Sequence, residues 1–300
     1  MTRPFHTLDV FTETPLAGNP LAVVFDAQGL DDARMQAIAA EFNLSETVFV
    51  FEPKNAVNSA RVRIFTPKRE LPFAGHPTVG AAALIADQRA GALLAAQDLR
   101  IVLEEPIGDV VCVARRRKGQ ALAAYFELPR LPERLAGPTP SRAEISAGLG
   151  IEPADIGFDR HEPGVYSAGA PFLFVPVRSL DAIGRAAPGA MPWTAKDGPA
   201  TFVYTREAER QGSAYHARMF AGGWGVGEDP ATGSAVAAFA GVLQAFDRPR
   251  DGEHMLTIEQ GFEMGRPSLI SLGLTVENGA VISATIGGSV VLVSSGALDL

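Results

Sequence analysis

The sequence predicts an α+β protein built from two similar domains, each with many antiparallel strands and one alanine-rich helix. Three observations support this fold class: the second half of the chain repeats the first, strand-like segments dominate both halves, and each half has a single long run of small residues. Strands and helices alternate too sparsely for a doubly wound sheet. Because alanine lets neighbouring elements approach a helix closely, we expect each sheet to wrap around its own helix.

The internal repeat swaps a histidine for an aspartate. Residues 76–81 match residues 229–234, so Asp229 takes the place of His76. Three further matches keep nearly the same offset: 17–21 with 168–172, 63–65 with 218–220 and, more weakly, 99–104 with 254–259. A repeat this long indicates two domains rather than a solenoid, with a cleft where the paired loops meet.

In the first half, β-branched and aromatic runs predict strands at residues 7–12, 21–25, 45–51, 61–66, 99–104 and 110–114. Asp31 or Asp32 is suited to cap a helix that places Met35, Ile38 and Phe42 on one face. A second helix, made of small residues, is expected at 78–87.

In the second half we expect strands at 171–177, 201–205, 215–220 and 289–293, and a helix at 234–246. The proline-rich stretch 129–140 is the predicted linker. The predicted domains are therefore residues 1–128 and 129–300, with a return of the last strand to the first domain left open.

Composition excludes several functions. The net charge of −8 argues against a nucleic-acid surface, and the basic run that begins at Arg115 reads as a solvated hairpin turn. Cys112 is the single cysteine, which fits a reducing compartment. The N-terminal residues lack the apolar core of a signal peptide, and no apolar stretch is long enough to span a bilayer. We expect a cytoplasmic protein that binds neither nucleic acid nor membrane.

No cofactor is expected. The five histidines, at positions 6, 76, 161, 216 and 254, include no pair at metal-ligand spacing. The glycine-rich run at 222–227 has the wrong spacing for a dinucleotide fingerprint, and the predicted helix begins several residues later. Activity should therefore need neither metal nor nucleotide.

Two helix starts carry the candidate chemistry. The repeat places His76 and Asp229 at equivalent points of two domains, where a cleft between them would bring both to one substrate. Thr232, Gly233 and Ser234 offer free N–H groups and hydroxyls to a carboxylate or oxyanion. The alternative, left open here, is that these residues form only an ordinary Ser/Thr N-cap.

Glu46 is the third candidate. It begins an otherwise apolar strand and shares a face with Leu44, Val48 and Val50. Loss of hydration there is expected to raise its pKa toward the range useful for proton transfer. The alternative is an exposed glutamate at the end of a strand.

These residues lie in motifs that resemble the PhzF family of phenazine-biosynthesis-like isomerases over nearly the whole chain. The motifs, in order, are Asp9-Val10-Phe11-Thr12, residues 18–23 (Gly-Asn-Pro-Leu-Ala-Val), Leu44-Ser45-Glu46-Thr47, residues 73–78 (Phe-Ala-Gly-His-Pro-Thr) and residues 228–235 (Glu-Asp-Pro-Ala-Thr-Gly-Ser-Ala). The resemblance implies the fold of diaminopimelate epimerase, in which two similar domains each form a β-barrel around a central helix, with the active site between them.

The resemblance also implies a cofactor-free acid/base isomerase that acts as a homodimer on a small carboxylic acid. The best-understood member isomerises a dihydro-hydroxyanthranilate on the route to phenazines. By this resemblance Glu46 shuttles the proton and His76 and Asp229 are the other catalytic residues. Substrate binding falls to Ser234 together with Gly75, Thr232 and Gly233.

Two alternatives remain. One is a racemase or epimerase of the two-cysteine kind on the same fold, in which facing thiols remove and return a proton. This chain lacks both thiols, since His76 and Asp229 occupy the loops and Cys112 lies elsewhere. The other is a non-catalytic protein that binds a small ligand in the same cleft.

Overall fold

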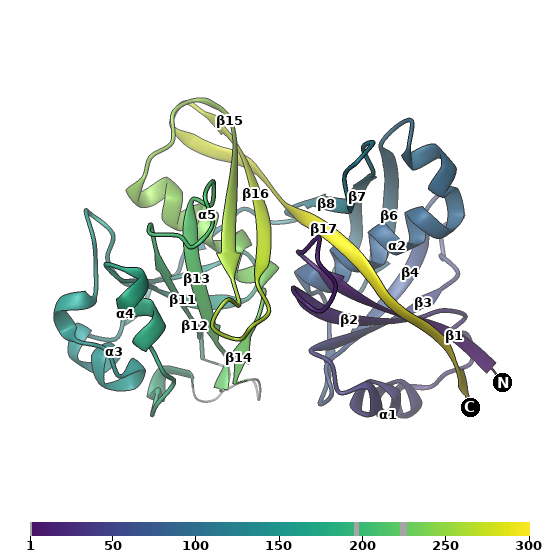
Figure 1. Cartoon of the computed structure of the whole chain (residues 1–300), viewed down its shortest axis with the longest axis horizontal. Coiled ribbons are helices and arrows are strands. Elements are labelled where there is room, and N and C mark those ends of the chain that lie inside the picture. Colours follow the sequence, from purple (N-terminus) through teal and green to yellow (C-terminus); the bar gives the residue numbers. More distant parts are fainter. Residues whose placement is uncertain (1, 195–197, 223–226) are drawn as a thin grey trace. The chain divides into compact units, whose positions relative to one another are not determined.

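The chain folds into two compact units. The computed structural model describes residues 2–194, 198–222 and 227–300 (Figure 1). Unit 1 contains the chain up to Glu127 together with Gly287–Leu300, and unit 2 contains Leu128–Ile286. The last strand, β17 (Ala280–Asp299), therefore begins in unit 2 and ends in unit 1.

The elements of unit 1, besides the end of β17, are β1 (Thr2–Val10), β2 (Asn19–Val24), α1 (Asp32–Phe42), β3 (Glu46–Phe51), β4 (Ala60–Phe65), β5 (Glu70–Leu71), α2 (Gly75–Leu94), β6 (Leu99–Glu105), β7 (Gly108–Arg115) and β8 (Leu122–Glu127). Those of unit 2, besides the start of β17, are β9 (Glu133–Arg134), α3 (Arg142–Leu149), η1 (Pro153–Asp155), β10 (Gly164–Ser167), β11 (Pro171–Pro176), α4 (Leu180–Arg185), η2 (Pro192–Thr194), β12 (Ala200–Thr205), β13 (Tyr215–Phe220), β14 (Glu228–Asp229), α5 (Gly233–Phe246), β15 (Gly252–Gln260) and β16 (Ser268–Glu277).

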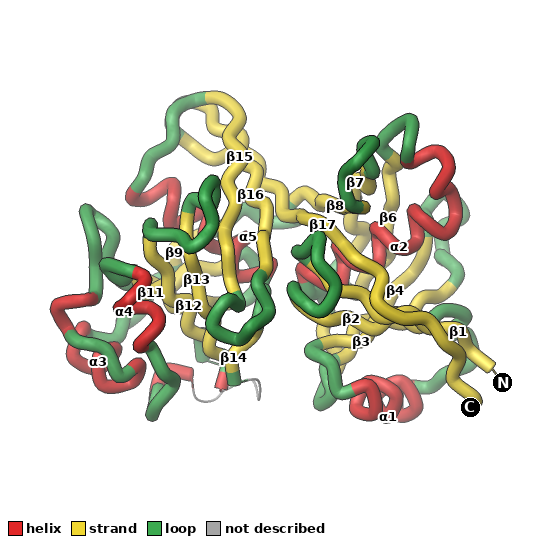
Figure 2. The backbone as a smooth tube through the Cα atoms, in the orientation of Figure 1, coloured by secondary structure: helices red, strands yellow, loops and turns green. Residues whose placement is uncertain are grey.

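The strands of unit 1 form a closed barrel around α2. β1 pairs with β2, β3 with β4, β6 with β7 and β7 with β8 in antiparallel fashion, while β2–β3 and β4–β6 are parallel. The end of β17 closes the ring, because it pairs with both β8 and β1. Helix α2 contacts six of these strands, and its first twelve residues are buried (Figure 2). The predicted α+β barrel around a central helix is confirmed.

Small residues permit this close packing. A Cβ added at Gly80 of α2 would lie 2.5 Å from the Leu21 side chain and 2.9 Å from that of Val10, on two strands of the wall. At Gly287, where β17 crosses β8, a Cβ would lie 2.4 Å from the carbonyl of Ala124. Non-bonded atoms do not approach this closely. A larger side chain at either position would therefore push α2 away from the barrel wall or β17 away from β8.

Unit 2 repeats the pairing pattern of unit 1. β10–β11, β12–β13 and β15–β16 are antiparallel, while β11–β12 and β13–β15 are parallel. Helix α5 takes the place of α2, and nine of its fourteen residues are buried. The segment after β8 joins this sheet, since Leu128 N–H donates to the Ala284 carbonyl and β9 pairs with β10.

Several predicted boundaries were wrong, each for a physical reason. β1, expected at 7–12, starts at Thr2 because Thr2 pairs with Asp299 of β17. α2, expected from residue 78, starts at Gly75. Pro77 fits in the first turn because N–H groups there make no hydrogen bond within the helix, so the missing N–H of proline costs nothing. Helix α3 was not predicted, although its capping box, Ser141 with Glu144, is visible in the sequence as a Ser-x-x-Glu pattern.

The basic run lies in the β7–β8 turn, as the hairpin interpretation predicts. Arg115 and Arg117 pair with Asp98, and Arg116 pairs with Asp87. Two carboxylates of unit 1 thus pair with these three arginines.

Candidate active site

Glu46 and His76 lie side by side in unit 1. Glu46 opens β3 and pairs in register with Leu21 of β2, while His76 is the second residue of α2. Nε2 of His76 lies 3.5 Å from Oε2 of Glu46, and their side chains are 5% and 16% exposed. Glu46 is therefore not the exposed strand-end residue of the alternative interpretation, because it lies against a buried imidazole.

His76 is neutral at physiological pH. Burial lowers its pKa to about 3, and a hydrogen bond to the backbone carbonyl of Pro20 opposes this shift only in part. One ring nitrogen thus carries the proton and donates it to Pro20, while Nε2 has no other hydrogen-bond partner among the described residues. A neutral imidazole has one N–H and one lone pair, so the lone pair of Nε2 points toward Glu46.

Glu105 lies beneath the start of α2 and was not predicted from the sequence. Its Oε1 lies 2.7 Å from the hydroxyl oxygen of Thr78, which also lies 2.8 Å from the Ala74 carbonyl. Burial raises the pKa of Glu105 to about 8, against the opposing effect of the Thr78 hydrogen bond. The Thr78 hydroxyl thus lies within hydrogen-bond distance of both the Glu105 carboxyl and the Ala74 carbonyl. The pair fixes the first turn that carries Gly75 and His76.

Asp229 and Thr232 form the corresponding cluster in unit 2. Asp229 ends β14 and is buried, and the Thr232 hydroxyl donates to its Oδ2 at 2.5 Å. Gln260 ties the cluster together: its Nε2 donates to the Asp229 carbonyl at 2.7 Å, and its Oε1 accepts from Thr232 N–H at 3.2 Å. Gln260 ends β15 as Glu105 ends β6, so each unit places a polar side chain under its helix start.

The ordinary N-cap interpretation is wrong for Thr232. It occupies the N-cap of α5, but its side chain makes no hydrogen bond to the helix. Its carbonyl accepts from the N–H groups of Ala235 and Val236. Within the described part of the chain, the N–H groups of Gly233 and Ser234 have no acceptor, and Ser234 is partly exposed. Two N–H groups and a hydroxyl at a helix start form an anion-binding arrangement.

A repeated ion pair braces the chain before each helix. Arg63 makes a bidentate pair with Glu70, with Nη2 2.5 Å from Oε2, and Arg218 makes the same pair with Glu228, with Nε 2.8 Å from Oε1. Each pair links β4 to β5 or β13 to β14, the short hairpins that lead into α2 and α5. The matched segments 63–65 and 218–220 contained both arginines, but nothing in the sequence identified their glutamate partners.

The two clusters belong to different units: Glu46, Gly75 and His76 to unit 1, and Asp229, Thr232, Gly233 and Ser234 to unit 2. That His76 and Asp229 face each other across a cleft stays a prediction. Part of the glycine-rich run, residues 223–226, lies outside the described residues.

Three further findings concern metal binding, membrane-spanning helices and the two-cysteine alternative. Among the described residues there is no group of three or more His, Cys, Asp or Glu side chains suited to a metal ion. No helix in that part of the chain is long and apolar enough to cross a membrane. Cys112 is buried in β7, and burial raises the pKa of its thiol, the opposite of what a proton-exchanging thiolate needs.

Comparison with known proteins places the chain in a family. The family model described as phenazine biosynthesis-like protein (PhzC-PhzF) matches residues 8–296. An uncharacterised isomerase of Mesorhizobium japonicum is 49% identical, with 99% of each chain covered. The trans-2,3-dihydro-3-hydroxyanthranilate isomerase of Pseudomonas fluorescens is 35% identical over 88% of this chain and 87% of its own.

Solved structures agree. The crystal structure of a PhzF family protein from Bacillus anthracis matches with a TM-score of 0.88 and 25% identity, covering 100% of both chains. The family model, the relatives and the solved structure thus point to one family. The chain therefore belongs to the PhzF family of phenazine biosynthesis-like proteins, and it is an isomerase.

Proposed function

We propose that this isomerase moves a proton between two carbons of a small carboxylic acid by general acid/base catalysis, without metal or cofactor. The observation that carries the proposal is the contact between Glu46 and a neutral His76, 3.5 Å apart and shielded from solvent. A substrate of the dihydro-hydroxyanthranilate type or a related unsaturated acid fits this chemistry, since the relative from Pseudomonas fluorescens carries that name.

The first step breaks a C–H bond of the substrate. The Glu46 carboxylate takes the proton, and the electron pair left on carbon spreads into the adjacent double bond and toward the substrate carboxylate. The lone pair of His76 Nε2 then accepts a hydrogen bond from the newly protonated Glu46. This contact holds one proton between the two side chains, ready for return.

The second step returns the proton to a different carbon on the same face, which regenerates the Glu46 carboxylate and leaves an isomer of the substrate. Ser234 and the N–H groups of Gly233 and Ser234 bind the substrate carboxylate, where negative charge increases as the proton leaves. Thr232 holds the Asp229 carboxylate through the 2.5 Å hydrogen bond. Asp229 and His76 orient the polar substituent of the substrate.

The test is an NMR screen in D₂O. The purified protein is incubated with trans-2,3-dihydro-3-hydroxyanthranilate and with a panel of unsaturated, β-hydroxy and amino cyclic acids. We expect deuterium at a ring carbon of at least one acid, with a rate unchanged by dialysis against a chelator. Binding of these acids with no exchange in any would instead support a non-catalytic ligand-binding protein. Restoration of a lost rate by one metal would contradict the cofactor-free part of the proposal.

The proposal also assigns a homodimer, as the family resemblance implies, and a cytoplasmic location, which the single cysteine favours. Sedimentation of the purified protein at several concentrations measures the oligomeric state directly.

A further inference from the structure

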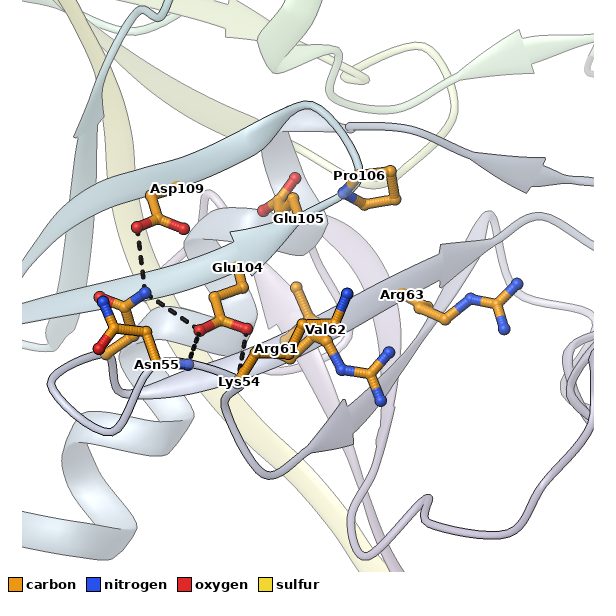
Figure 3. Close-up of a pocket in the computed structure, with 10 residues that line it drawn as sticks. Lys54, Asn55, Arg61, Val62, Arg63, Glu104, Glu105, Pro106 and Asp109 are labelled. Carbon is orange, nitrogen blue, oxygen red and sulfur yellow. Dashed lines mark hydrogen bonds between the residues drawn. The ribbon is translucent and has the colours of Figure 1, made fainter.

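Unit 1 has a pocket of about 500 Å³ in its barrel wall (Figure 3), and neither Glu46 nor His76 lines it. It lies where two parallel strands part. β4 and β6 pair only at Ala60–Leu103 and Arg61–Glu104, after which β6 turns away at Pro106. Arg61 and Arg63 line the pocket from β4, and Glu104, Glu105 and Asp109 line it from β6 and β7.

The internal repeat shows which part of unit 2 corresponds to this pocket. Arg61 pairs with Glu104 across the parallel strands of unit 1, and His216 pairs with Glu259 at the same point of unit 2. The two glutamates accept equivalent hydrogen bonds. Glu104 accepts from the N–H groups of residues 54 and 55, and Glu259 accepts from those of residues 209 and 210. His216 therefore occupies in unit 2 the position that Arg61 occupies in unit 1.

In unit 2 a carboxylate of the chain itself occupies this position. The connection between β15 and β16, residues 261–267, brings Glu263 to His216, where Nε2 lies 2.9 Å from Oε1. Glu263 also lies 3.9 Å from Nε of Arg218, the counterpart of Arg63. Burial lowers the pKa of His216, but its hydrogen bonds to Glu259 and Glu263 outweigh this and raise the pKa to about 9. The protonated His216 and the Glu263 carboxylate thus form an ion pair at this position.

In unit 1 the same connection is too short to supply a carboxylate. Only residues 106 and 107 join β6 to β7. Arg61 forms no ion pair with any described residue; its guanidinium lies 4.3 Å from the centre of the Phe51 ring, and its Nε is buried without a hydrogen bond. A buried N–H donor of a charged group without an acceptor is costly, so an arriving carboxylate gains a strong charge-assisted hydrogen bond.

The acids around the pocket do not compensate Arg61. Asn58 donates to Glu104 at 3.1 Å and to Asp109 at 3.0 Å (Figure 3), and neither carboxylate forms an ion pair with Arg61. Glu105, whose pKa burial raises to about 8, is mostly uncharged at neutral pH. Two ionised carboxylates at the rim still disfavour a dianion such as phosphate, so a ligand with one carboxylate fits best.

We propose that the pocket around Arg61, hereafter the Arg61 pocket, binds a small carboxylic acid whose carboxylate takes the position that Glu263 takes in unit 2. The volume suits a ligand of one ring or a short chain. Arg61 holds the carboxylate, and Val62 with Pro106 contacts the apolar part of the ligand.

Crystals grown with 4-bromobenzoate locate the ligand through the anomalous signal of bromine. We expect a bromine peak in the Arg61 pocket and the carboxylate on Arg61. This result does not depend on the proposed reaction, which is tested by turnover. A peak only beside Ser234, or no peak at all, would overturn the proposal.

Calorimetric titration with benzoate then separates the residues. Arg61→Gln should weaken binding tenfold or more at this pocket, whereas Arg100→Gln, which removes an exposed arginine at the other end of β6, should leave it unchanged. Pro106→Trp keeps every charge and fills the pocket from its exposed rim, so it should also abolish binding. Equal affinity in wild type and both pocket variants would refute the assignment, as would displacement of benzoate by an equimolar amount of inorganic phosphate.

Discussion

Glu46→Gln is expected to lower turnover about a hundredfold or more while substrate still binds. Glutamine keeps the shape of the side chain and most of its hydrogen bonds, but it cannot take up and return a proton. Its partner stays in place, because the position of His76 is fixed by burial and by Pro20 rather than by Glu46. The measurement is kcat and KM with the acid that shows exchange in the D₂O screen, together with direct binding of that acid.

Ser234→Ala is the matched contrast for this variant. It removes a hydroxyl from the carboxylate-binding helix start and leaves the proton carrier intact. We therefore expect it to weaken binding as well as rate, whereas Glu46→Gln lowers rate alone. If Glu46→Gln kept near-normal kcat, a different group would carry the proton and the mechanism proposed for Glu46 would be wrong.

The second large effect is on stability in acid. Burial keeps His76 neutral in the folded protein, with a pKa of about 3 against 6.5 for an unperturbed histidine. Because the unfolded chain binds this proton more tightly, the stabilising effect is complete above pH 6.5 and declines as pH falls from there toward 3. At pH 4.5 the loss is about 3 kcal/mol relative to pH 8, at about 1.4 kcal/mol per pKa unit.

Urea unfolding of wild type and His76→Gln between pH 4 and 8 measures this contribution. The variant is less stable at pH 8 because packing is lost, but its free energy of unfolding should fall less on acidification. Val79→Ala, a neighbour in α2 that is buried and does not titrate, is the control and should give a constant offset at all pH values. A constant offset for His76→Gln as well would mean that the imidazole is not held neutral.

The repeat in the sequence predicted the fold because it records the topology of the protein. Segments that match in sequence, such as 63–65 and 218–220, lie on β4 and β13, which have the same neighbours in the same directions. The extra length of β1 could not be predicted, since it depends on pairing with β17 at the other end of the chain. The first turn of α2 could not be predicted for a local reason, because Gly75 and Pro77 are typical of loops.

The candidate site was predicted in part. Glu46 and His76 were each named from their motifs, but their contact depends on how β3 and α2 pack within the barrel. Glu105 and Gln260 were missed because their roles lie in hydrogen bonds to residues distant in the sequence: Glu105 to Thr78, and Gln260 to Thr232 and Asp229. The weakest match, 99–104 with 254–259, pointed to both residues. Its last positions, Glu104 and Glu259, are equivalent in the two units and directly precede Glu105 and Gln260.

The most direct test of the central claim is the fate of the transferred proton. A substrate carrying deuterium at the carbon that loses its proton is converted in H₂O, and the product is examined by NMR at the carbon that gains one. A single carrier, Glu46, predicts that part of the deuterium appears at the second carbon and that Glu46→Gln abolishes this transfer. Normal turnover with no deuterium carried over at any pH would contradict a single shuttling residue.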